Sequence, residues 1–413
     1  MKSQKKKSIE TIKNSNEITE KIIEDYSLKQ KQEKKENEEK WEKIETVIIK
    51  KYNNFKPGSK IISFDLDDTL ITEKGKKFQY NENFPKDYKT MYDEKKMNET
   101  LEEYSKKNYI FIVFSNQSII SLGKINEDLF KERIDNIFKN NFKYPFLFLA
   151  STTKDYYRKP SIGMFEIFEN TLNNNIKIDK ENSYYIGDAA GREKTKNKKK
   201  DFSDSDYKFA LNCNLNFLTP EEFFLNEKQT IPKIKEDYHI YDNNNNAHIK
   251  FNDKNKEMII LIGAPGSGKS TFCENYLKNY IRINQDNLKN KKKCFEKAIE
   301  AIKDNNNIVI DNTNPQRNIR EEYIKIAKDN NYKVRAFIMK VNKDLAFHLN
   351  NLRIINNERK HFSEAVNQIP IHTFFKNYEE PKINEGFDDI VQVNFVPGPF
   401  QSEKDKEIFY MFS

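Results

Sequence analysis

The sequence predicts an α/β protein with two domains, each built on a parallel sheet. The chain has 413 residues, and a domain takes roughly 100–200 residues. From Lys60 onward, short apolar runs rich in Ile, Phe and Val alternate with stretches of helical length, which is typical of parallel strands joined by helices. A charged, asparagine-rich stretch interrupts this alternation near the middle of the chain. Two α/β domains joined by a linker fit both the length and the pattern.

The composition divides the chain into four segments. The first 50 residues hold 13 lysines and 11 acidic residues, so we expect residues 1–57 to be a charged arm, partly helical or disordered. Its first lysines are either solvated or a tether for nuclear import or nucleic acid. Residues 58–228 and 257–413 carry the two alternating patterns, and residues 229–256 read as the linker.

The overall composition excludes several classes of protein. Lysine and arginine number 72 against 64 acidic residues, a net charge of +8, which allows a polyanionic partner. The three cysteines have neither disulfide-type nor zinc-type spacing, so we expect a reducing compartment. No apolar run approaches the roughly 18 residues of a membrane span. We therefore expect a soluble protein that is not secreted.

A glycine-rich string opens the second alternating segment. Gly263-Ala-Pro-Gly-Ser-Gly-Lys-Ser270 follows an apolar strand and precedes a helix, as a phosphate-binding loop requires. Glycine lets backbone N–H groups wrap a phosphate without a Cβ in the way. The string predicts an ATP site in which a lysine reaches the phosphates and a serine hydroxyl ligates Mg²⁺; its candidate residues are Gly263, Gly266, Ser267, Gly268, Lys269, Ser270 and Thr271.

Three later residues indicate which reaction the ATP site carries out. Asp286 follows a second short strand, where a carboxylate can take the proton of an acceptor hydroxyl. Asp311 ends a third strand and suits Mg²⁺ or its water shell. Either aspartate is as readily explained by a turn or a helix cap. Arg353 is a candidate lid residue that closes on the transferring phosphate, or a charge on a helix surface.

A pair of aspartates ends the first strand of the other segment. Strand periodicity aims Asp65 and Asp67 to the same side at the carboxyl edge of the sheet. One carboxylate can attack a phosphate while the other protonates the leaving oxygen, with Mg²⁺ holding the anionic substrate. Supporting residues follow in order after later strands: Ser115 and Asn116 as phosphate donors, Lys159 as the balancing cation and Asp188 as a metal ligand.

Together these strings resemble a known family. The order of a haloacid-dehalogenase-like phosphatase followed by a P-loop kinase resembles the eukaryotic polynucleotide kinase 3′-phosphatases. The strings that carry the resemblance are Phe64-Asp-Leu-Asp-Asp-Thr-Leu-Ile71, Tyr157-Arg-Lys-Pro160, Ile186-Gly-Asp-Ala-Ala-Gly-Arg192, Lys198-Lys-Lys-Asp-Phe-Ser203, Thr219-Pro-Glu-Glu-Phe-Phe224, the phosphate-binding loop and Ile310-Asp-Asn-Thr-Asn-Pro315.

The resemblance implies a role for each matching residue. Asp65 would be the phosphatase nucleophile and Asp67 its general acid and base, and in the kinase half Asp286 would activate a 5′-hydroxyl while Arg353 acts as the lid arginine. The metal ligands expected in the two halves are Asp65, Asp67, Asp188, Ser270 and Asp311. Supporting residues are Asn116, Arg192, Asp201 and Arg320.

Three departures from the family bear on function. Animal members begin with a forkhead-associated domain that docks phosphorylated scaffold proteins, and the first 57 residues are too few and too polar for the roughly 100 residues of such a sandwich, so we expect no docking of that kind. Asp68 stands where many related phosphatases have glycine, and a small polar residue can still adopt the turn. Ser115 replaces a threonine and keeps the hydroxyl.

The sequence therefore predicts an enzyme that removes 3′-phosphates from DNA ends and phosphorylates 5′-hydroxyls, using Mg²⁺ and ATP. Only 47 positions separate Asp67 from Ser115, enough for a flap and a helix but not for a large cap, which favours a polynucleotide end over a metabolite. RNA ends, or a catalytically inactive end-binding scaffold, are the alternatives. We expect a monomer in the nucleus, or in the cytoplasm if the chain is viral.

Overall fold

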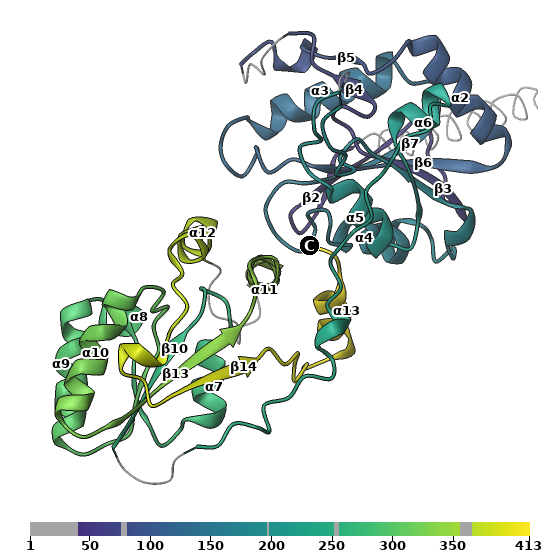
Figure 1. Cartoon of the computed structure of the whole chain (residues 1–413). Coiled ribbons are helices and arrows are strands. Elements are labelled where there is room, and N and C mark those ends of the chain that lie inside the picture. The colour runs from purple at the N-terminus through teal and green to yellow at the C-terminus, as the bar shows by residue number, and fades with distance from the viewer. Residues whose placement is uncertain (1–39, 76–80, 196–197, 252–255, 356–365) are drawn as a thin grey trace, which may run out of the picture. The chain divides into compact units, whose positions relative to one another are not determined.

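The computed structural model describes residues 40–75, 81–195, 198–251, 256–355 and 366–413. The described residues divide into two compact units: the first runs to Ile234, and the second spans Lys235–Met411. The larger part of the predicted arm, residues 1–39, lies outside the described residues. Each unit is an α/β fold around one main sheet (Figure 1), as predicted.

The first unit is built on a seven-stranded sheet. Its strand order is β1-β2-β7-β6-β3-β8-β9, and every pair from β7 to β9 is parallel. The strands are β1 (Glu42–Ile44), β2 (Val47–Tyr52), β3 (Lys60–Phe64), β6 (Tyr109–Asn116), β7 (Phe146–Ser151), β8 (Tyr184–Ile186) and β9 (Asn216–Leu218). The helices are α2 (Glu94–Lys106), α3 (Glu127–Asn140), α4 (Gly163–Ile167), α5 (Ser205–Asn212) and α6 (Pro220–Leu225).

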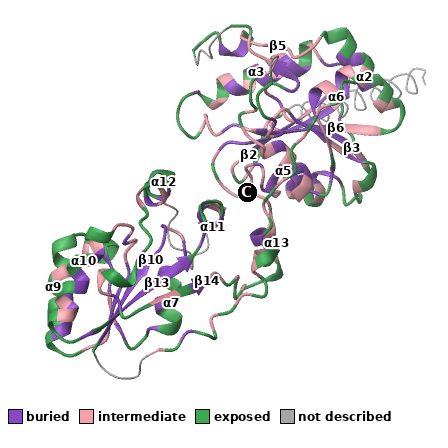
Figure 2. Ribbon diagram, viewed as in Figure 1, coloured by how far each residue is buried: buried purple, intermediate pink, exposed green. Residues whose placement is uncertain are grey.

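Alternate side chains of the central strand β3 enter two separate cores. Ile62 and Phe64 pack with residues of α2, α3 and α6, whereas Ile61 packs with residues of α4 and α5. Both faces of the sheet are therefore covered by helices, and the inner strands β3, β6 and β7 are largely buried (Figure 2). Burial on both faces explains why these strands read as continuous apolar runs.

The predicted end of the charged arm at residue 57 is wrong. β2 pairs antiparallel with β7 and with β1, so residues 42–52 extend the phosphatase-type sheet. Val47, Ile48 and Ile49 are fully or almost fully buried. The buried Lys50 donates to Asp135 of α3 at 2.8 Å. The average charge of the first fifty residues does not reveal this strand, because its apolar run Val47–Ile49 is short and its neighbours are strongly charged.

The second unit is built on a five-stranded parallel sheet with the order β11-β12-β10-β13-β14. The strands are β10 (Glu257–Ile262), β11 (Ile281–Ile283), β12 (Ile308–Ile310), β13 (Lys333–Lys340) and β14 (Asp389–Asn394). The helices are α7 (Lys269–Tyr276), α8 (Gln285–Leu288), α9 (Lys291–Lys303), α10 (Arg317–Asp329), α11 (Lys343–Ile355), α12 (Gln368–Asn377) and α13 (Glu403–Tyr410).

Strand β10 again divides its side chains between two cores. Ile260 and Ile262 pack with α9 and α10, whereas Ile259 and Leu261 pack with α7. Figure 1 shows α9 and α10 together on one side of this sheet and α7 on the other. The phosphate-binding loop thus follows a central strand that is packed against helices on both faces.

Residues 235–251 of the predicted linker belong to the second unit, whereas residues 229–234 belong to the first. Asn246 exchanges hydrogen bonds with the backbone of Asn394, at 3.1 and 2.8 Å, and Asn244 donates to the carbonyl of Phe395. Their amides therefore fix this segment beside the end of β14, so residues 235–251 are not a free linker. Within the described part of the chain, no helix is both long and apolar enough to cross a bilayer.

Candidate active sites

The first site forms where β3 ends. The backbone N–H of Asp65 donates to the carbonyl of Ile186 at 2.8 Å, which fixes the aspartate beside the end of β8. Its carboxylate accepts from the ammonium group of Lys159 at 2.5 Å. Lys159 is buried and also donates to Asp206 at 2.8 Å and to the hydroxyl of Tyr185 at 2.6 Å. The expected balancing cation therefore lies against the expected nucleophile.

Asn116 fixes Lys159 rather than presenting its amide to a phosphate. Its side-chain oxygen accepts from the Lys159 N–H at 2.9 Å, and its side-chain nitrogen donates to the Lys159 carbonyl at 3.1 Å. These two bonds engage both the oxygen and the nitrogen of the Asn116 side-chain amide. The structure thus gives Asn116 a positioning role, which differs from the phosphate donor that the sequence predicts.

Three carboxylates converge at this edge of the sheet. Asp65, Asp188 and Asp206 each offer an oxygen within 4.8 Å of the others. Hard carboxylate oxygens are the ligands that Mg²⁺ prefers, so this group fits the expected metal. Asp206 is the member that sequence reasoning missed. The sequence gives no signal for it: only in the structure is its approach to Gly187 visible, where a Cβ would lie 2.5 Å from the Asp206 side chain.

Burial and mutual repulsion raise the pKa values of Asp65 and Asp188. Burial raises the pKa of Asp65 to about 7; Lys159 opposes this increase, and Asp206 and Asp67 add to it. Burial likewise raises the pKa of Asp188 well above its usual value, and the charges of Asp206 and Asp65 raise it further. A cation at the cluster would remove this repulsion.

Asp67 is not among the three carboxylates of that cluster, and its role as a metal ligand stays a prediction. β3 ends at Phe64, so strand periodicity no longer sets its direction. Its carboxylate accepts from the Gln117 amide at 2.8 Å, and the same nitrogen donates to the Ser115 hydroxyl at 2.9 Å. Burial raises the pKa of Asp67, and the Gln117 bond lowers it. The buried Ser115 is therefore coupled to Asp67 through Gln117, a residue that the sequence analysis did not select.

The turn after Asp67 has the geometry expected of it. Asp68 has a φ of 56°, in the left-handed region, and its N–H donates to the carbonyl of Ile71 at 2.7 Å. The Thr72 hydroxyl donates to the Asp68 carboxylate at 2.7 Å. A small polar residue thus adopts the turn that glycine would adopt without strain.

Asp201 and Arg192 shape the loop that carries Asp188. The Asp201 carboxylate accepts from the Arg192 backbone at 2.9 Å, from its guanidinium at 2.8 Å and from the backbone of Ala190 at 3.2 Å. Arg192 also pairs with Glu221 of α6 at 3.0 Å. Both predicted supporting residues therefore act on the loop rather than on a phosphate.

The second site forms where β10 passes into α7. Gly266 and Gly268 have φ of 85° and 84°, a conformation that favours glycine. The Lys269 ammonium group is buried inside the loop and donates to the carbonyls of Gly263 and Ala264 at 2.9 and 2.8 Å. Burial lowers the pKa of Lys269 to about 8. Ser267 is buried in the same loop, whereas Thr271 is exposed on the first turn of α7.

Asp311 lies beside this loop at the end of β12. One carboxylate oxygen accepts from the Ser270 hydroxyl at 3.1 Å, from Arg282 at 2.6 Å and from Asn284 at 3.1 Å. The other oxygen is buried and has no hydrogen-bond partner in the described part of the chain. An unsatisfied buried carboxylate oxygen beside a serine hydroxyl fits a Mg²⁺ ion or one of its waters. Arg282 is a further charge that sequence reasoning missed.

Asp286 and Arg353 both act on the charge of Lys269. Asp286 is exposed in the first turn of α8, and Arg353 projects from α11. Arg353 lowers the pKa of Lys269 and Asp286 raises it, both behind the larger effects of burial and Asp311. The structure thus brings both predicted residues into the electrostatic neighbourhood of the loop lysine.

Arg320 has a structural role, which corrects its prediction as a supporting site residue. Its guanidinium is fully buried and pairs with Glu385 at 2.8 Å. It also donates to the carbonyls of Pro315 and Glu379, both at 3.0 Å. These contacts tie α10 to the segment before β14, because one guanidinium supplies donors in several directions.

The two sites define a two-unit protein of phosphate chemistry, with a haloacid-dehalogenase-like phosphatase unit and a P-loop kinase unit. The family model described as polynucleotide kinase 3 phosphatase matches residues 60–224. The chain is 36% identical over 369 residues to the "Putative bifunctional polynucleotide phosphatase/kinase" of Acanthamoeba polyphaga mimivirus, covering 81% of this chain and 85% of that protein. It is 32% identical over 384 residues to the bifunctional polynucleotide phosphatase/kinase of Schizosaccharomyces pombe, covering 89% and 86%. The chain belongs to the bifunctional polynucleotide phosphatase/kinase family.

Proposed function

We propose that this chain heals nucleic-acid ends, removing 3′-phosphates with the first unit and phosphorylating 5′-hydroxyls with the second. The observation that carries the proposal is the pairing, within one chain, of the Asp65–Lys159 site with the loop around Lys269. The Asp65–Lys159 site is suited to hydrolysing a phosphate ester, and the loop around Lys269 is suited to transferring a phosphate from ATP. Together they leave a 5′-phosphate and a 3′-hydroxyl, the ends that ligation needs.

In the phosphatase unit, an Asp65 oxygen attacks phosphorus and the bond to the 3′-oxygen breaks. Asp67 gives its proton to that leaving oxygen and then accepts one from the water that hydrolyses the aspartyl-phosphate. Lys159 and the Ser115 hydroxyl hold the phosphate oxygens, and Gln117 directs the carboxylate of Asp67. Mg²⁺ at Asp65, Asp188 and Asp206 would offset negative charge on the phosphate.

In the kinase unit, the 5′-hydroxyl oxygen attacks the γ-phosphorus of ATP and its proton passes to Asp286, while ADP leaves. The loop N–H groups and Lys269 hold the phosphates. Arg353 approaches the transferring group from α11. Ser270 and Asp311 would hold the Mg²⁺ that accompanies ATP.

The finer parts of the proposal concern substrate and setting. We propose Mg²⁺ and ATP as cofactors, DNA ends as the preferred substrate, a monomeric enzyme and a nuclear location, or a cytoplasmic one if the chain is viral. Matched DNA and RNA oligonucleotides separate the two substrates, because they differ only at the 2′-hydroxyl and one base methyl. Equal or faster turnover of RNA would overturn the DNA preference.

The test is a nicked duplex with a 3′-phosphate and a 5′-hydroxyl at the break. We expect Asp65→Asn to abolish 3′-phosphate removal while 5′-phosphorylation continues, and Lys269→Ala to do the reverse. Each activity is thus the folding control for the other. Retention of phosphate removal by Asp65→Asn, or of 5′-phosphorylation by Lys269→Ala, would overturn the assigned site. End binding without either turnover in the wild type would favour the inactive scaffold.

A further inference from the structure

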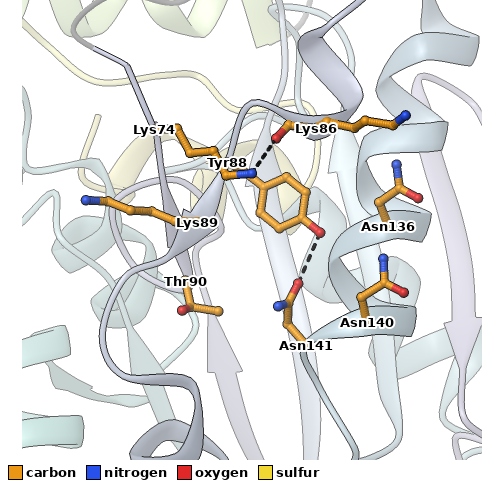
Figure 3. Close-up of a pocket in the computed structure, with 8 residues that line it drawn as sticks. All are labelled: Lys74, Lys86, Tyr88, Lys89, Thr90, Asn136, Asn140 and Asn141. Atoms are coloured by element: carbon orange, nitrogen blue, oxygen red, sulfur yellow. Dashed lines mark hydrogen bonds between the residues drawn. The ribbon is translucent and has the colours of Figure 1, made fainter.

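A pocket of about 520 Å³ lies on the phosphatase unit beside a short hairpin. The hairpin consists of β4 (Ile71–Thr72) and β5 (Lys89–Thr90), and the 3₁₀ helix η1 (Phe84–Lys86) precedes β5. Figure 3 shows the pocket between this region and the end of α3. Its lining residues are Lys74, Lys86, Tyr88, Lys89, Thr90, Asn136, Asn140 and Asn141.

The walls of the pocket are held together by side-chain to backbone bonds. Arg133 of α3 is buried and donates to the carbonyls of Phe84 and Asp87 at 2.8 and 2.9 Å. Asn136 donates to the carbonyl of Pro85 at 3.3 Å. These bonds fix the segment before β5 against α3, so the pocket is formed in advance of any ligand, as most binding sites are.

The lining combines the groups that recognise a nucleotide. Lysines 74, 86 and 89 stand at its edge, and none of the described lining residues is acidic. In Figure 3 Lys74 reaches to the ring of Tyr88, Lys86 extends toward Asn136 of α3, and Lys89 points away from the helix. The Tyr88 hydroxyl donates to Asn141 at 3.0 Å. Asn136 and Asn140, one turn apart on α3, supply both amide donors and acceptors. Lysines bind phosphates, an aromatic ring stacks on a base, and amides read base edges.

The same elements adjoin the phosphatase site. Asp67 forms a bridge with Ile71, the first residue of β4. A strand with its 3′ end at Asp65 therefore has the pocket on a neighbouring element of the same unit.

We propose that this pocket binds an internal nucleotide of the polynucleotide whose 3′-phosphate is removed, with backbone phosphates on the lysines at its edge and the base against Tyr88. The proposal rests on the phosphatase function proposed above. It adds a substrate contact outside the reacting centre, which would favour polynucleotide ends over single nucleotides.

The test compares a long single-stranded oligonucleotide bearing a 3′-phosphate with thymidine 3′-phosphate as the minimal substrate. The variant Lys86→Ala/Lys89→Ala removes two of these lysines, and Asn140→Ala removes an amide without changing charge. Lys95→Ala/Lys106→Ala is the matched control, since both lysines are exposed on α2 of the same unit. Each lost phosphate contact should reduce the slope of log affinity against log salt by about 0.7.

We expect both pocket variants to raise KM for the oligonucleotide by about 3-fold or more, with kcat and the rate on thymidine 3′-phosphate unchanged. The lysine variant's deficit should shrink by about 2.6-fold per contact between about 50 and 200 mM salt. Wild-type KM in the pocket variants, or an equal rise in the α2 control, would overturn the pocket proposal and leave the phosphatase function standing. A wild type inactive on both substrates would overturn both.

Discussion

Gln117 offers the sharpest test of how the phosphatase site is organised. Its amide nitrogen donates to the Asp67 carboxylate at 2.8 Å and to the Ser115 hydroxyl at 2.9 Å, and the side chain is 4% exposed. Gln117→Met keeps the length and volume of the side chain and removes the donor. Asp67 then loses the bond that directs its carboxylate toward the leaving oxygen.

The size of the effect follows from the kind of bond that is lost. A hydrogen bond to a charged group contributes about 1.5–3 kcal/mol, which corresponds to about 10- to 150-fold in a rate constant. Because Gln117 acts through Asp67 rather than on substrate, we expect the phosphatase reaction to lose this factor in kcat, with little change in KM. The rate of the kinase reaction should stay unchanged.

The assay measures both activities on one oligonucleotide for the wild type, Gln117→Met and Asn98→Leu. Asn98 is a matched control, because it is another buried amide of the same unit and bonds the backbone of Glu94 and Asn141 away from the site. Its loss should lower stability without lowering kcat. A wild-type kcat in Gln117→Met, or the same kcat loss in both variants, would refute the positioning role.

Three further predictions concern the residues around the two sites. Asp206→Asn should raise the Mg²⁺ concentration for half-maximal phosphatase rate by about 10- to 100-fold, leaving kinase activity unchanged; an unaltered Mg²⁺ titration would remove Asp206 from the metal site. Arg320→Met leaves Glu385 buried without its partner and should destabilise the kinase unit by about 3–5 kcal/mol in urea denaturation, and Arg320→Met/Glu385→Leu should recover part of that loss. Burial raises the pKa of Glu221, but bonds from Lys198 and Arg192 outweigh it and lower the pKa from 4.5 to about 2. Because the folded-state pKa of Glu221 is depressed, the stabilisation from its ionised form is complete above pH 4.5 and is lost as pH falls toward 2. The free energy of unfolding of the wild type should exceed that of Glu221→Gln by at most about 2–3 kcal/mol at neutral pH. A difference that persists at pH 2 would contradict this assignment.

Local strings allowed the sequence to predict both sheets and most of both sites. A strand followed by a glycine-rich turn constrains its neighbours within a few residues, so the loop around Lys269 could be recognised directly. Asp206 could not be, because Asp201 and Asp204 stand beside it with the same chemistry. Only the three-dimensional approach of Asp206 to Gly187 distinguishes them, and this contact joins the first turn of α5 to the loop after β8.

Averages over long windows explain the errors at the segment boundaries. Residues 42–52 carry an apolar strand within a charged surrounding, and the pairing of β2 with β7 outweighs that composition. The asparagines near residue 245 look like a polar linker, yet their amides bond backbone groups beside β14. In both places the segment is held by partners far along the chain, so no local sequence pattern predicts the pairing.

The charge balance of the two sites explains why one lysine is buried among acids and the other among carbonyls. Lys159 faces Asp65 and Asp206 directly, and their charges outweigh burial and raise its pKa, so it stays an ammonium ion. Lys269 faces the neutral carbonyls of its own loop, and burial lowers its pKa to about 8. An incoming phosphate must therefore compete with carboxylates for Lys159 but gains Lys269 without breaking an ion pair. The phosphatase site depends more strongly on an added cation for the same reason, since a phosphate enters it against negative charge.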